Sequence, residues 1–455
     1  PREVGPLEAV HRLPTNRLEG AGRALGLIAG AAALLALFAA AGVALGRNPL
    51  PLPIVLVVGL GLVGTLALAI GRYDAAVALG VILLAAVRLE PAPADLVFGV
   101  VIAVAFAAGS FGLDRVPLSV TVLVSSFLAL NLLAAVEVID AGRAAQFFAI
   151  TLYLGIFGLW LTGYVRSVRR ARVIVLAYLF AAVASAAVAC LALFAPFPGS
   201  QAFVDGPRAQ GLFKDPNVFG PFLVPAALIL MEETAAPRLL RLRLPTKLIF
   251  LSVVAMGVVF SFSRAGWLNL GVGAVVLFAV LVLRRGGGHR AMTLLVVMLL
   301  SAAALFAVVS ATSSSSFLQE RAAFQVYDVQ RFGAQLSAVD LAAQDPKGIG
   351  PGQFELVSDL SAHSTYARAL AEEGVLGMLV LLGLMVLTLG FAARSAVVGR
   401  DTYGIGSAAL LAAWCGILAN SLFIDTLHWR HLWLLAALIW AGAALRIRYP
   451  SRYDT

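Results

Sequence analysis

The sequence predicts an all-α polytopic membrane protein of about 12–14 transmembrane helices. Of its 455 residues, 61% are hydrophobic and only 13% are charged, which is not a soluble composition. Apolar runs of membrane-spanning length recur along the chain. The arginines behind the net charge of +9 fall in short segments between these runs, where they act as orientation signals. We therefore expect contact with membrane lipids and no nucleic-acid partner.

A length of about 20 apolar residues, with tolerance for shorter runs, gives fourteen candidate spans. The first follows a basic, proline-containing leader without a small-residue cleavage signature, so we expect a retained span and not a signal peptide. The third is the weakest of the set. The spans lie at roughly 24–46, 52–70, 74–88, 93–111, 116–136, 145–165, 173–196, 218–232, 247–263, 266–283, 291–311, 374–393, 404–424 and 431–445.

The distribution of basic residues predicts which loops face the cytoplasm. With a cytoplasmic N-terminus, about 22 of the 33 lysines and arginines lie inside, as the positive-inside rule expects. The inner segments are then 166–172, 233–247, 284–290, 394–401 and the C-terminal tail, and the outer ones are 197–217, 261–266, 312–373 and 424–431.

This topology divides the chain into four parts. Residues 1–196 form N-terminal transmembrane helices, and 197–311 form helices whose outer turns carry arginines. Residues 312–373 form an outer, helical loop, and 374–455 form the C-terminal helices and a cytoplasmic tail.

The long outer loop is predicted to contain an amphipathic helix that lies against something apolar. Its apolar residues recur at steps of three and four, and Asp345-Pro346 followed by "GIGPG" ends the helix. "GIGPGQF" (348–354) does not follow a strand, so we expect a tight turn and not a nucleotide loop. The apolar residues are Leu318, Ala322, Val326, Val329, Phe332, Leu336 and Val339.

Three arginines lie on outer segments where the topology rule does not require them. They are Arg208, Arg264 and Arg331. A guanidinium binds phosphate oxygens in a bidentate fork, so the three could converge on one polyanion. The structural alternative is that they reach lipid headgroups or pair with acids such as Asp328.

His363 is the candidate general base. Imidazole is the side chain whose ordinary pKa lets it accept and return a proton near neutral pH, although a histidine at a loop end is often only a hydrogen-bonding group. Tyr366 is predicted to share its helical side. Glu372 and Glu373 open the next span, and the simplest interpretation is that they stabilise the N-terminus of that helix.

Other polar residues indicate no metal or redox site. Cys190 and Cys415 lie inside apolar runs, and the outer loops contain no D-x-D pair. His428 and His431 lack the carboxylates that would complete a metal site, so we expect them to join Trp429 and Trp433 in an aromatic belt at the membrane interface.

Four motifs resemble a known family. His363-Ser364, nine further residues, and then Gly374 and Gly377 fit the H-[N/S/Q]-x9-G-x-x-[G/T/Y] signature of bacterial O-antigen ligases. "GLFKDPNVFGPFL" is similar to the family's "G-x-F-x-x-P-N-x-x-A" stretch, "SFSRAGWLNL" to its "S-R-G-A-W" turn, and "GIGPGQF" to its "G-V-G-P-G-x-F" turn. The resemblance covers about 200 to 450 and is specific for the O-antigen ligase and polymerase superfamily.

The resemblance implies a glycosyltransferase of the bacterial inner membrane with a GT-C-like fold, cytoplasmic termini and a site that faces the periplasm. Such an enzyme moves a glycan from undecaprenyl diphosphate to an acceptor hydroxyl, here of lipid A-core type, with inversion. It needs no metal, nucleotide or other cofactor. Its partners are the lipid-linked glycan donor and a lipid or glycan acceptor.

Residue by residue, the resemblance assigns His363 as the base on the acceptor hydroxyl. Arg208 and Arg264 become diphosphate clamps, and Arg331 a further phosphate or sugar contact. The supporting residues in the same motifs are Lys214, Asn217, Tyr366 and Glu372.

The sequence departs from the family pattern at two places. Ser364 stands where asparagine is commoner. Gly220 takes the place of the usual small residue and is followed by Pro221, a residue type that kinks helices.

Three alternatives remain beside the ligase. A repeat-unit polymerase of the same superfamily would use the same donor. A small-anion transporter would be expected to carry ionisable groups near mid-membrane, where the strongly polar residues are mainly Asn131 and Asn420. An envelope scaffold would explain the spans but not the outer arginines and His363.

Overall fold

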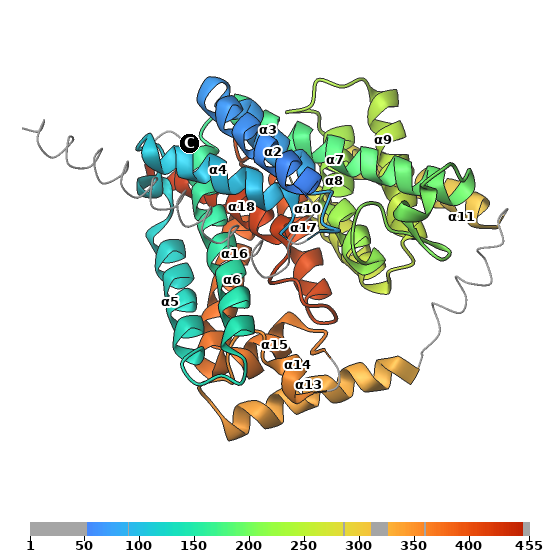
Figure 1. Cartoon of the computed structure of the whole chain (residues 1–455). Helices are drawn as coiled ribbons and strands as arrows, with labels where there is room; N and C mark the ends of the chain where they lie inside the picture. The colour runs from blue at the N-terminus through green and yellow to red at the C-terminus, as the bar shows by residue number, and fades with distance from the viewer. Residues whose placement is uncertain (1–51, 90, 285–286, 311–325, 359–360, 449–455) are drawn as a thin grey trace, which may run out of the picture. The chain divides into compact units, whose positions relative to one another are not determined.

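The computed structural model describes residues 52–89, 91–284, 287–310, 326–358 and 361–448 (Figure 1). The first candidate span, the tail from 449 onward, and Leu318 and Ala322 of the predicted loop helix lie outside the described residues.

Each of the other thirteen candidate spans contains a helix (Figure 1). Predicted span 74–88 gave the shortest of them, α3, which is followed by a turn. The helices are α2 (Leu52–Gly71), α3 (Tyr73–Leu83), α4 (Pro93–Ala107), α5 (Leu118–Ala134), α6 (Ala141–Tyr164), α7 (Val168–Phe194), α8 (Pro216–Ala235), α9 (Leu244–Phe260), α10 (Arg264–Leu283), α11 (Gly288–Ser310), α16 (Gly374–Val398), α17 (Ser407–Asn420) and α18 (Arg430–Arg448).

Short elements connect these helices. The outer loop contains α13 (Val326–Gln344), α14 (Phe354–Val357) and α15 (Thr365–Glu372). Two 3-10 helices lie in other connections: η1 (Leu113–Arg115) precedes α5, and η2 (Ser200–Phe203) follows α7. After η2, β1 (Val204–Asp205) pairs antiparallel with β2 (Arg208–Ala209), and Asp205 faces Arg208.

Five helices in the described ranges are long and apolar enough to cross a membrane: α6, α7, α8, α10 and α16. This architecture is that of an all-helical, multi-pass membrane protein, as the composition predicted.

Helix starts follow ordinary capping chemistry, because each of five N-cap side chains accepts a backbone N–H from the first turn. The caps are Asp140, Ser167, Asp215, Ser263 and Ser364.

The chain folds as two compact units. One contains 52–76 and 97–111 among its described residues, and within it the Tyr73 hydroxyl donates to the Val101 carbonyl at 3.0 Å. The other contains 77–96 and the described residues from 112 onward. All of the predicted site residues belong to this second unit.

In the second unit, α10 and α17 pack antiparallel at very close range. A Cβ at Gly416 of α17 would lie 2.5 Å from the Asn269 carbonyl oxygen of α10. Arg284, which follows α10, donates to the Ser407 hydroxyl at the start of α17 at 2.9 Å. Arg264, at the other end of α10, therefore lies at the level of the last turn of α17.

The predicted inner and outer segments lie at opposite ends of these helices. At the end that carries the predicted inner segments, Arg238 pairs with Asp401, and Arg284 also donates to the Ala396 carbonyl at 2.9 Å. These residues belong to, or adjoin, three segments assigned to the cytoplasm. The starts of α8, α10 and α16 and the end of α17 carry the predicted outer motifs. The geometry thus separates the two sets as a two-sided topology requires.

Helix α13 ends at Gln344, directly before Asp345-Pro346 as predicted, but it packs through a different face. Ala334, Ala338 and Ala342 are buried, and Ala338 joins a core with Phe354, Ala362 and Ala371. The predicted apolar face is exposed in this structure, because small alanines allow the closer approach to α15. Its described members are Val329, Phe332, Leu336 and Val339.

The close contact between α10 and α17 gives a stability prediction. Gly416→Ala should lower the free energy of unfolding by about 1–3 kcal/mol, because the added methyl meets the backbone of Asn269. Thermal unfolding in detergent measures the change.

Gly271→Ala is the matched control in α10, since a Cβ there meets nothing within 4 Å. Alanine favours helix over glycine by about 1 kcal/mol, so this variant should unfold at the same or a higher temperature. Equal midpoints for Gly416→Ala and wild type would contradict the packing.

Candidate functional site

His363 sits in a strained turn directly before α15. Its φ is 44°, in the left-handed region that few non-glycine residues adopt. Two hydrogen bonds hold the adjacent residues to the end of α17: the Ser364 hydroxyl donates to the Ser421 carbonyl at 3.3 Å, and the Thr365 N–H donates to the same oxygen at 3.0 Å. The backbone of His363 is therefore fixed from its C-terminal side.

Helix α15 is attached to α17 and to the turn that joins α17 and α18. The Thr426 N–H donates to the Thr365 hydroxyl at 2.7 Å, and the Tyr366 hydroxyl donates to the Leu418 carbonyl at 3.1 Å. Burial raises the pKa of Tyr366, so its hydroxyl keeps the proton that it donates. Tyr366 is thus an anchor of α15 on α17.

A buried arginine lies at the centre of the site. Arg368 of α15 pairs with Glu355, with Glu372 at 3.1 Å and with Asp425 at 3.0 Å. Burial alone would lower its pKa, but Asp425, Glu372 and Glu355 together raise it, so the guanidinium stays charged. Three segments far apart in sequence are joined at this one side chain.

A second arginine extends the cluster to α6. Arg143 pairs with Glu355 at 2.9 Å and donates to the Gly352 carbonyl. Both Arg143 and Arg368 lie over the Phe147 ring, with 5.3 and 5.9 Å from guanidinium carbon to ring centroid. Although burial opposes it, Arg368 lowers the pKa of Glu355 below its ordinary value.

Neither Glu372 nor Glu373 caps the following helix, so that interpretation was wrong. The Glu372 carboxylate accepts from the Gly352 N–H at 2.7 Å and the Phe354 N–H at 3.1 Å. Glu373 precedes α16 but makes no side-chain cap bond; its Oε1 accepts from the Asn131 amide at 2.9 Å. Glu372 instead holds the glycine-rich segment in place.

The segment 348–354 is a tight turn, as predicted. Gly348, Gly350 and Gly352 have φ of 91°, 98° and 71°. A Cβ at Gly348 would lie 2.4 Å from the Glu372 carbonyl oxygen, so only glycine allows this approach to the α15–α16 junction.

Arg208 lies against the "SFSRAG" turn. Its Nε donates to the Ser261 carbonyl and its Nη2 to the Asn217 side chain, both at 2.9 Å, and Asp205 is 3.8 Å away. Arg208 therefore links the "GLFKDPNVF" segment to the turn, and Asn217 fixes the position of its guanidinium.

Arg264 is the first residue of α10. Ser263 caps the helix by accepting from the Gly266 N–H at 3.1 Å, and Phe262 before it has φ of 49°. A cation at the N-terminus of a helix joins the positive end of the helix dipole, a combination that favours an anionic ligand.

Asn420 was noted in the sequence only as a mid-span polar residue. It is completely buried at the end of α17, at the level of Arg264, and neither polar atom of its side chain has a hydrogen-bond partner among the described residues. Its amide therefore retains its full hydrogen-bonding capacity.

The other predicted residues are Lys214, Arg331 and the histidines and tryptophans before and in α18. The Lys214 side chain is exposed, and the Arg331 side chain lies outside the described part of α13. The expected aromatic belt was wrong, because Trp429, His431 and Trp433 are buried. His431 stacks on Trp429, so packing inside the protein explains these residues.

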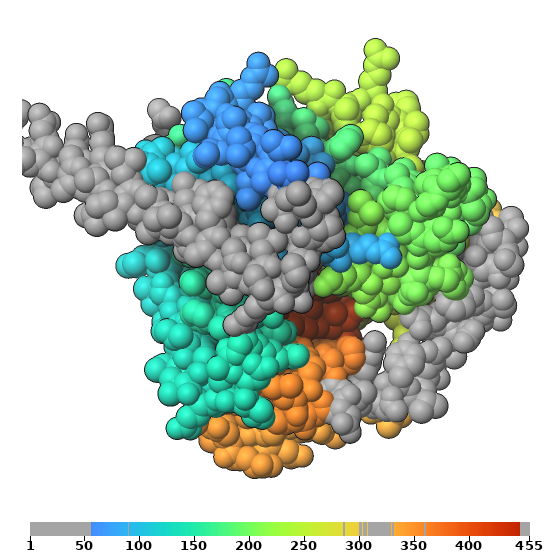
Figure 2. Space-filling view, viewed as in Figure 1, coloured from blue at the N-terminus to red at the C-terminus, as the bar shows by residue number. Residues whose placement is uncertain are grey.

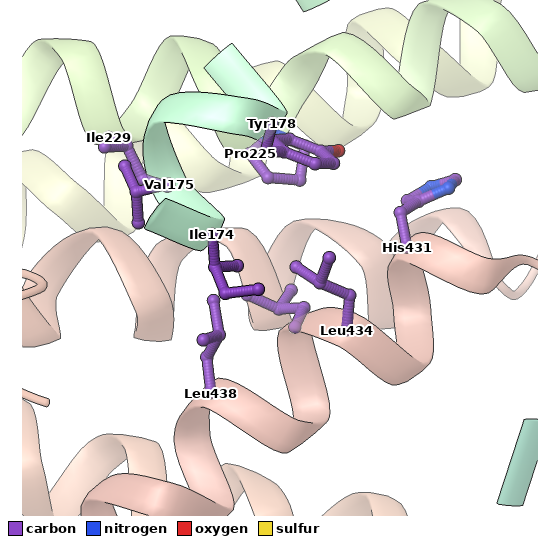
Figure 3. Close-up of a pocket in the computed structure, with 9 residues that line it drawn as sticks. Ile174, Val175, Tyr178, Pro225, Ile229, His431, Leu434 and Leu438 are labelled. Carbon is purple, nitrogen blue, oxygen red and sulfur yellow. The ribbon is translucent and has the colours of Figure 1, made fainter. Parts of the chain in front are cut away.

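An apolar pocket lies away from the site, between α7, α8 and α18 (Figure 3). His431 lies at one end of it, beside Leu434, and Leu438 lies near the other end with Ile174. Its lining carries no charged side chain, so it offers no chemistry for the predicted reaction.

No protein-family model matches the chain, and no curated protein matches it. The family assignment therefore stays a prediction from the four motifs.

The sequence did contain signals for the residues that were missed. Arg368 and Glu372 are spaced four apart on a helix, the spacing of an ion pair. Asp425 lies in the segment 424–431 ("IDTLHWRH"), which was predicted to be an outer segment and carries several polar residues. Glu355 has no comparable signal, since only the fold brings it to Arg368.

The adjacent glutamates should respond oppositely to the same substitution. Glu372→Gln should lower the free energy of unfolding by about 3 kcal/mol, because it breaks a buried ion pair with Arg368. Glu373→Gln should unfold at the same or a higher temperature at pH 8, because burial and then Glu372 raise the pKa of Glu373 well above its ordinary 4.5. Equal losses in both variants would contradict these roles.

The pH dependence follows from the raised pKa of Glu373. The folded chain keeps this proton while the unfolded chain releases it, so the contribution to stability is full below pH 4.5 and is lost as pH rises toward the folded pKa. Thermal melts across this range should show wild type losing stability relative to Glu373→Gln as pH rises. A constant difference would refute the raised pKa.

Proposed function

We propose that this chain is an O-antigen ligase-like glycosyltransferase. It transfers a glycan from undecaprenyl diphosphate to an acceptor hydroxyl of lipid A-core type, with inversion and without a metal. The proposal includes a GT-C-like fold of 12–14 spans in the bacterial inner membrane, cytoplasmic termini, and a site on the periplasmic side.

One observation carries the proposal. Among the described non-glycine residues, three have positive φ: Phe262, His363 and Tyr403. Two of them lie in the turns of the predicted base and of the predicted clamp Arg264. Strained backbone of this kind costs on the order of 1–3 kcal/mol and clusters at functional sites. Both turns lie at the same end of the packed pair α10 and α17.

His363 and the two arginines, Arg208 and Arg264, have different roles in the proposed transfer. His363 accepts the proton of the acceptor hydroxyl as its oxygen attacks the anomeric carbon. The bond from that carbon to the diphosphate oxygen breaks, and undecaprenyl diphosphate leaves with the electron pair. Arg208 and Arg264 stabilise the negative charge that develops on the leaving oxygen.

The fold supports this division of roles. Arg208 is held by Asn217 and Ser261, so its guanidinium is oriented before the donor arrives. Ser364 and Thr365 hold the His363 turn against Ser421. The transporter finds less support, because the described polar clusters lie at the two ends of the helices.

A gel of lipid-linked and surface glycans from a deletion strain tests the proposal. Full-length glycan on its polyprenyl carrier, with a bare final acceptor, is the expected result for a ligase. Single repeats on the acceptor would instead identify a polymerase, which differs only in the acceptor. Unchanged glycans would refute both.

His363→Ala should abolish transfer in that strain while the protein stays in the membrane, because no other group then accepts the hydroxyl proton. His289→Ala is the control and should transfer normally, since His289 is exposed at the start of α11, at the end of the helices opposite to His363. Normal surface glycans in the His363→Ala strain would show that His363 is not the general base.

Arg264→Lys should reduce transfer about 100-fold, because an ammonium cannot form the bidentate fork on phosphate. Arg290→Lys, an exposed residue of α11, should leave transfer unchanged. Glycan transfer by the purified protein measures both, and wild-type rates for Arg264→Lys would favour the lipid-headgroup alternative.

A further inference from the structure

Arg368 has no place in the proposed chemistry, although it lies five residues from His363. It is 5% exposed, and its donors are directed at protein carboxylates. Nη1 binds Glu372, Nη2 binds Glu355 and the Ser361 hydroxyl, and Nε faces Asp425. Because Arg368 is almost fully buried and three protein carboxylates already balance its charge, it is not a further clamp.

Its partners connect it to the turn that holds His363. Asp425 accepts from the Leu427 N–H at 3.1 Å and from the Thr365 hydroxyl at 3.4 Å. Thr365 in turn binds Thr426 and, through its N–H, the Ser421 carbonyl. The path from Arg368 to Thr365, the residue after Ser364, therefore runs through two contacts: Arg368 with Asp425, and Asp425 with Thr365.

A second path leads to the glycine turn. Glu372 binds Arg368 on one side and the Gly352 and Phe354 N–H groups on the other. Glu355 follows that turn and links Arg368 to Arg143 of α6. The arginine is thus the shared member of contacts that fix both ends of α15.

We propose that Arg368 is a positioning residue for His363: its ion pairs fix α15 so that the strained His363 turn presents the imidazole to the acceptor hydroxyl. This inference rests on the proposed transferase function. The φ of 44° at His363 needs a surrounding structure that prevents its relaxation, and the contacts through Asp425 and Glu372 provide it. The residue acts through His363 and touches no substrate.

Arg368→Ala in the purified full-length protein tests this role. A small misplacement of a catalytic group lowers rate about 100-fold, so kcat should fall by that factor while KM for the donor changes little, because Arg208 and Arg264 are unaffected. Guanidinium at millimolar concentration, far below denaturing levels, should refill the vacated site and restore much of kcat.

The controls separate this inference from the function on which it rests. Guanidinium should not restore His363→Ala, and it should not affect Arg290→Ala at the opposite end of the helices. If wild type transfers no glycan, the proposed function fails. If wild type is active and folded Arg368→Ala keeps its kcat, or loses it without any rescue by guanidinium, the positioning role is refuted.

Arg368→Lys covers the case in which the alanine variant does not fold. Lysine keeps one positive charge among the three carboxylates but cannot face all of them in a planar fork. We expect a folded protein with lowered kcat and near-normal KM for the donor. Wild-type kcat for Arg368→Lys would overturn the inference.

Discussion

The site depends on one buried guanidinium. Arg368 faces Glu355, Glu372 and Asp425, which come from α14 after the glycine turn, from α15 itself and from the turn between α17 and α18. Removal of one partner from a buried ion pair costs about 3–5 kcal/mol, because the remaining charge is left without compensation. The three segments are therefore held in one arrangement, and the His363 turn is built on it.

The close packing of α10 on α17 brings the Arg264 and Arg208 motifs near this arrangement. Glycine at 416 lets the two backbones approach, and the antiparallel pair sets Arg264 beside the end of α17. The Ser421 carbonyl at that end accepts from both Ser364 and Thr365. Arg208 reaches the same region through the Ser261 carbonyl. Motifs far apart in sequence thus meet at one end of the helices. In the space-filling view, α13 lies along the lower side, below the residues of α14 and α15 (Figure 2).

Much of the helical architecture could be predicted, because apolar runs of this length have few alternatives to a helix. The contacts between helices could not. The predicted apolar face of α13 is exposed, since backbone proximity to α15 favours Ala338 over the larger Leu336. Three of the four residues expected in an interfacial aromatic belt, Trp429, His431 and Trp433, are buried inside the protein, where His431 stacks on Trp429.

The site was predictable where its residues form local turns. Glycine spacing gave the turn at 348–354, and local motifs indicated Arg208, Arg264 and His363. Long-range pairing could not be predicted, because nothing in the sequence relates Asp425 to Arg368 or Glu373 to Asn131. Glu372 illustrates the difference: its position before a span suggested a helix cap, yet its partners lie in the preceding loop.

The most direct test of the account is a cryo-electron microscopy structure of the full chain in lipid with undecaprenyl diphosphate bound. The account predicts diphosphate density in contact with Arg208 and Arg264, with His363 nearby on the side of the phosphates that faces neither arginine. Density at the opposite end of the helices, near Arg238 and Arg284, would contradict it. So would a bound diphosphate that contacts neither Arg208 nor Arg264.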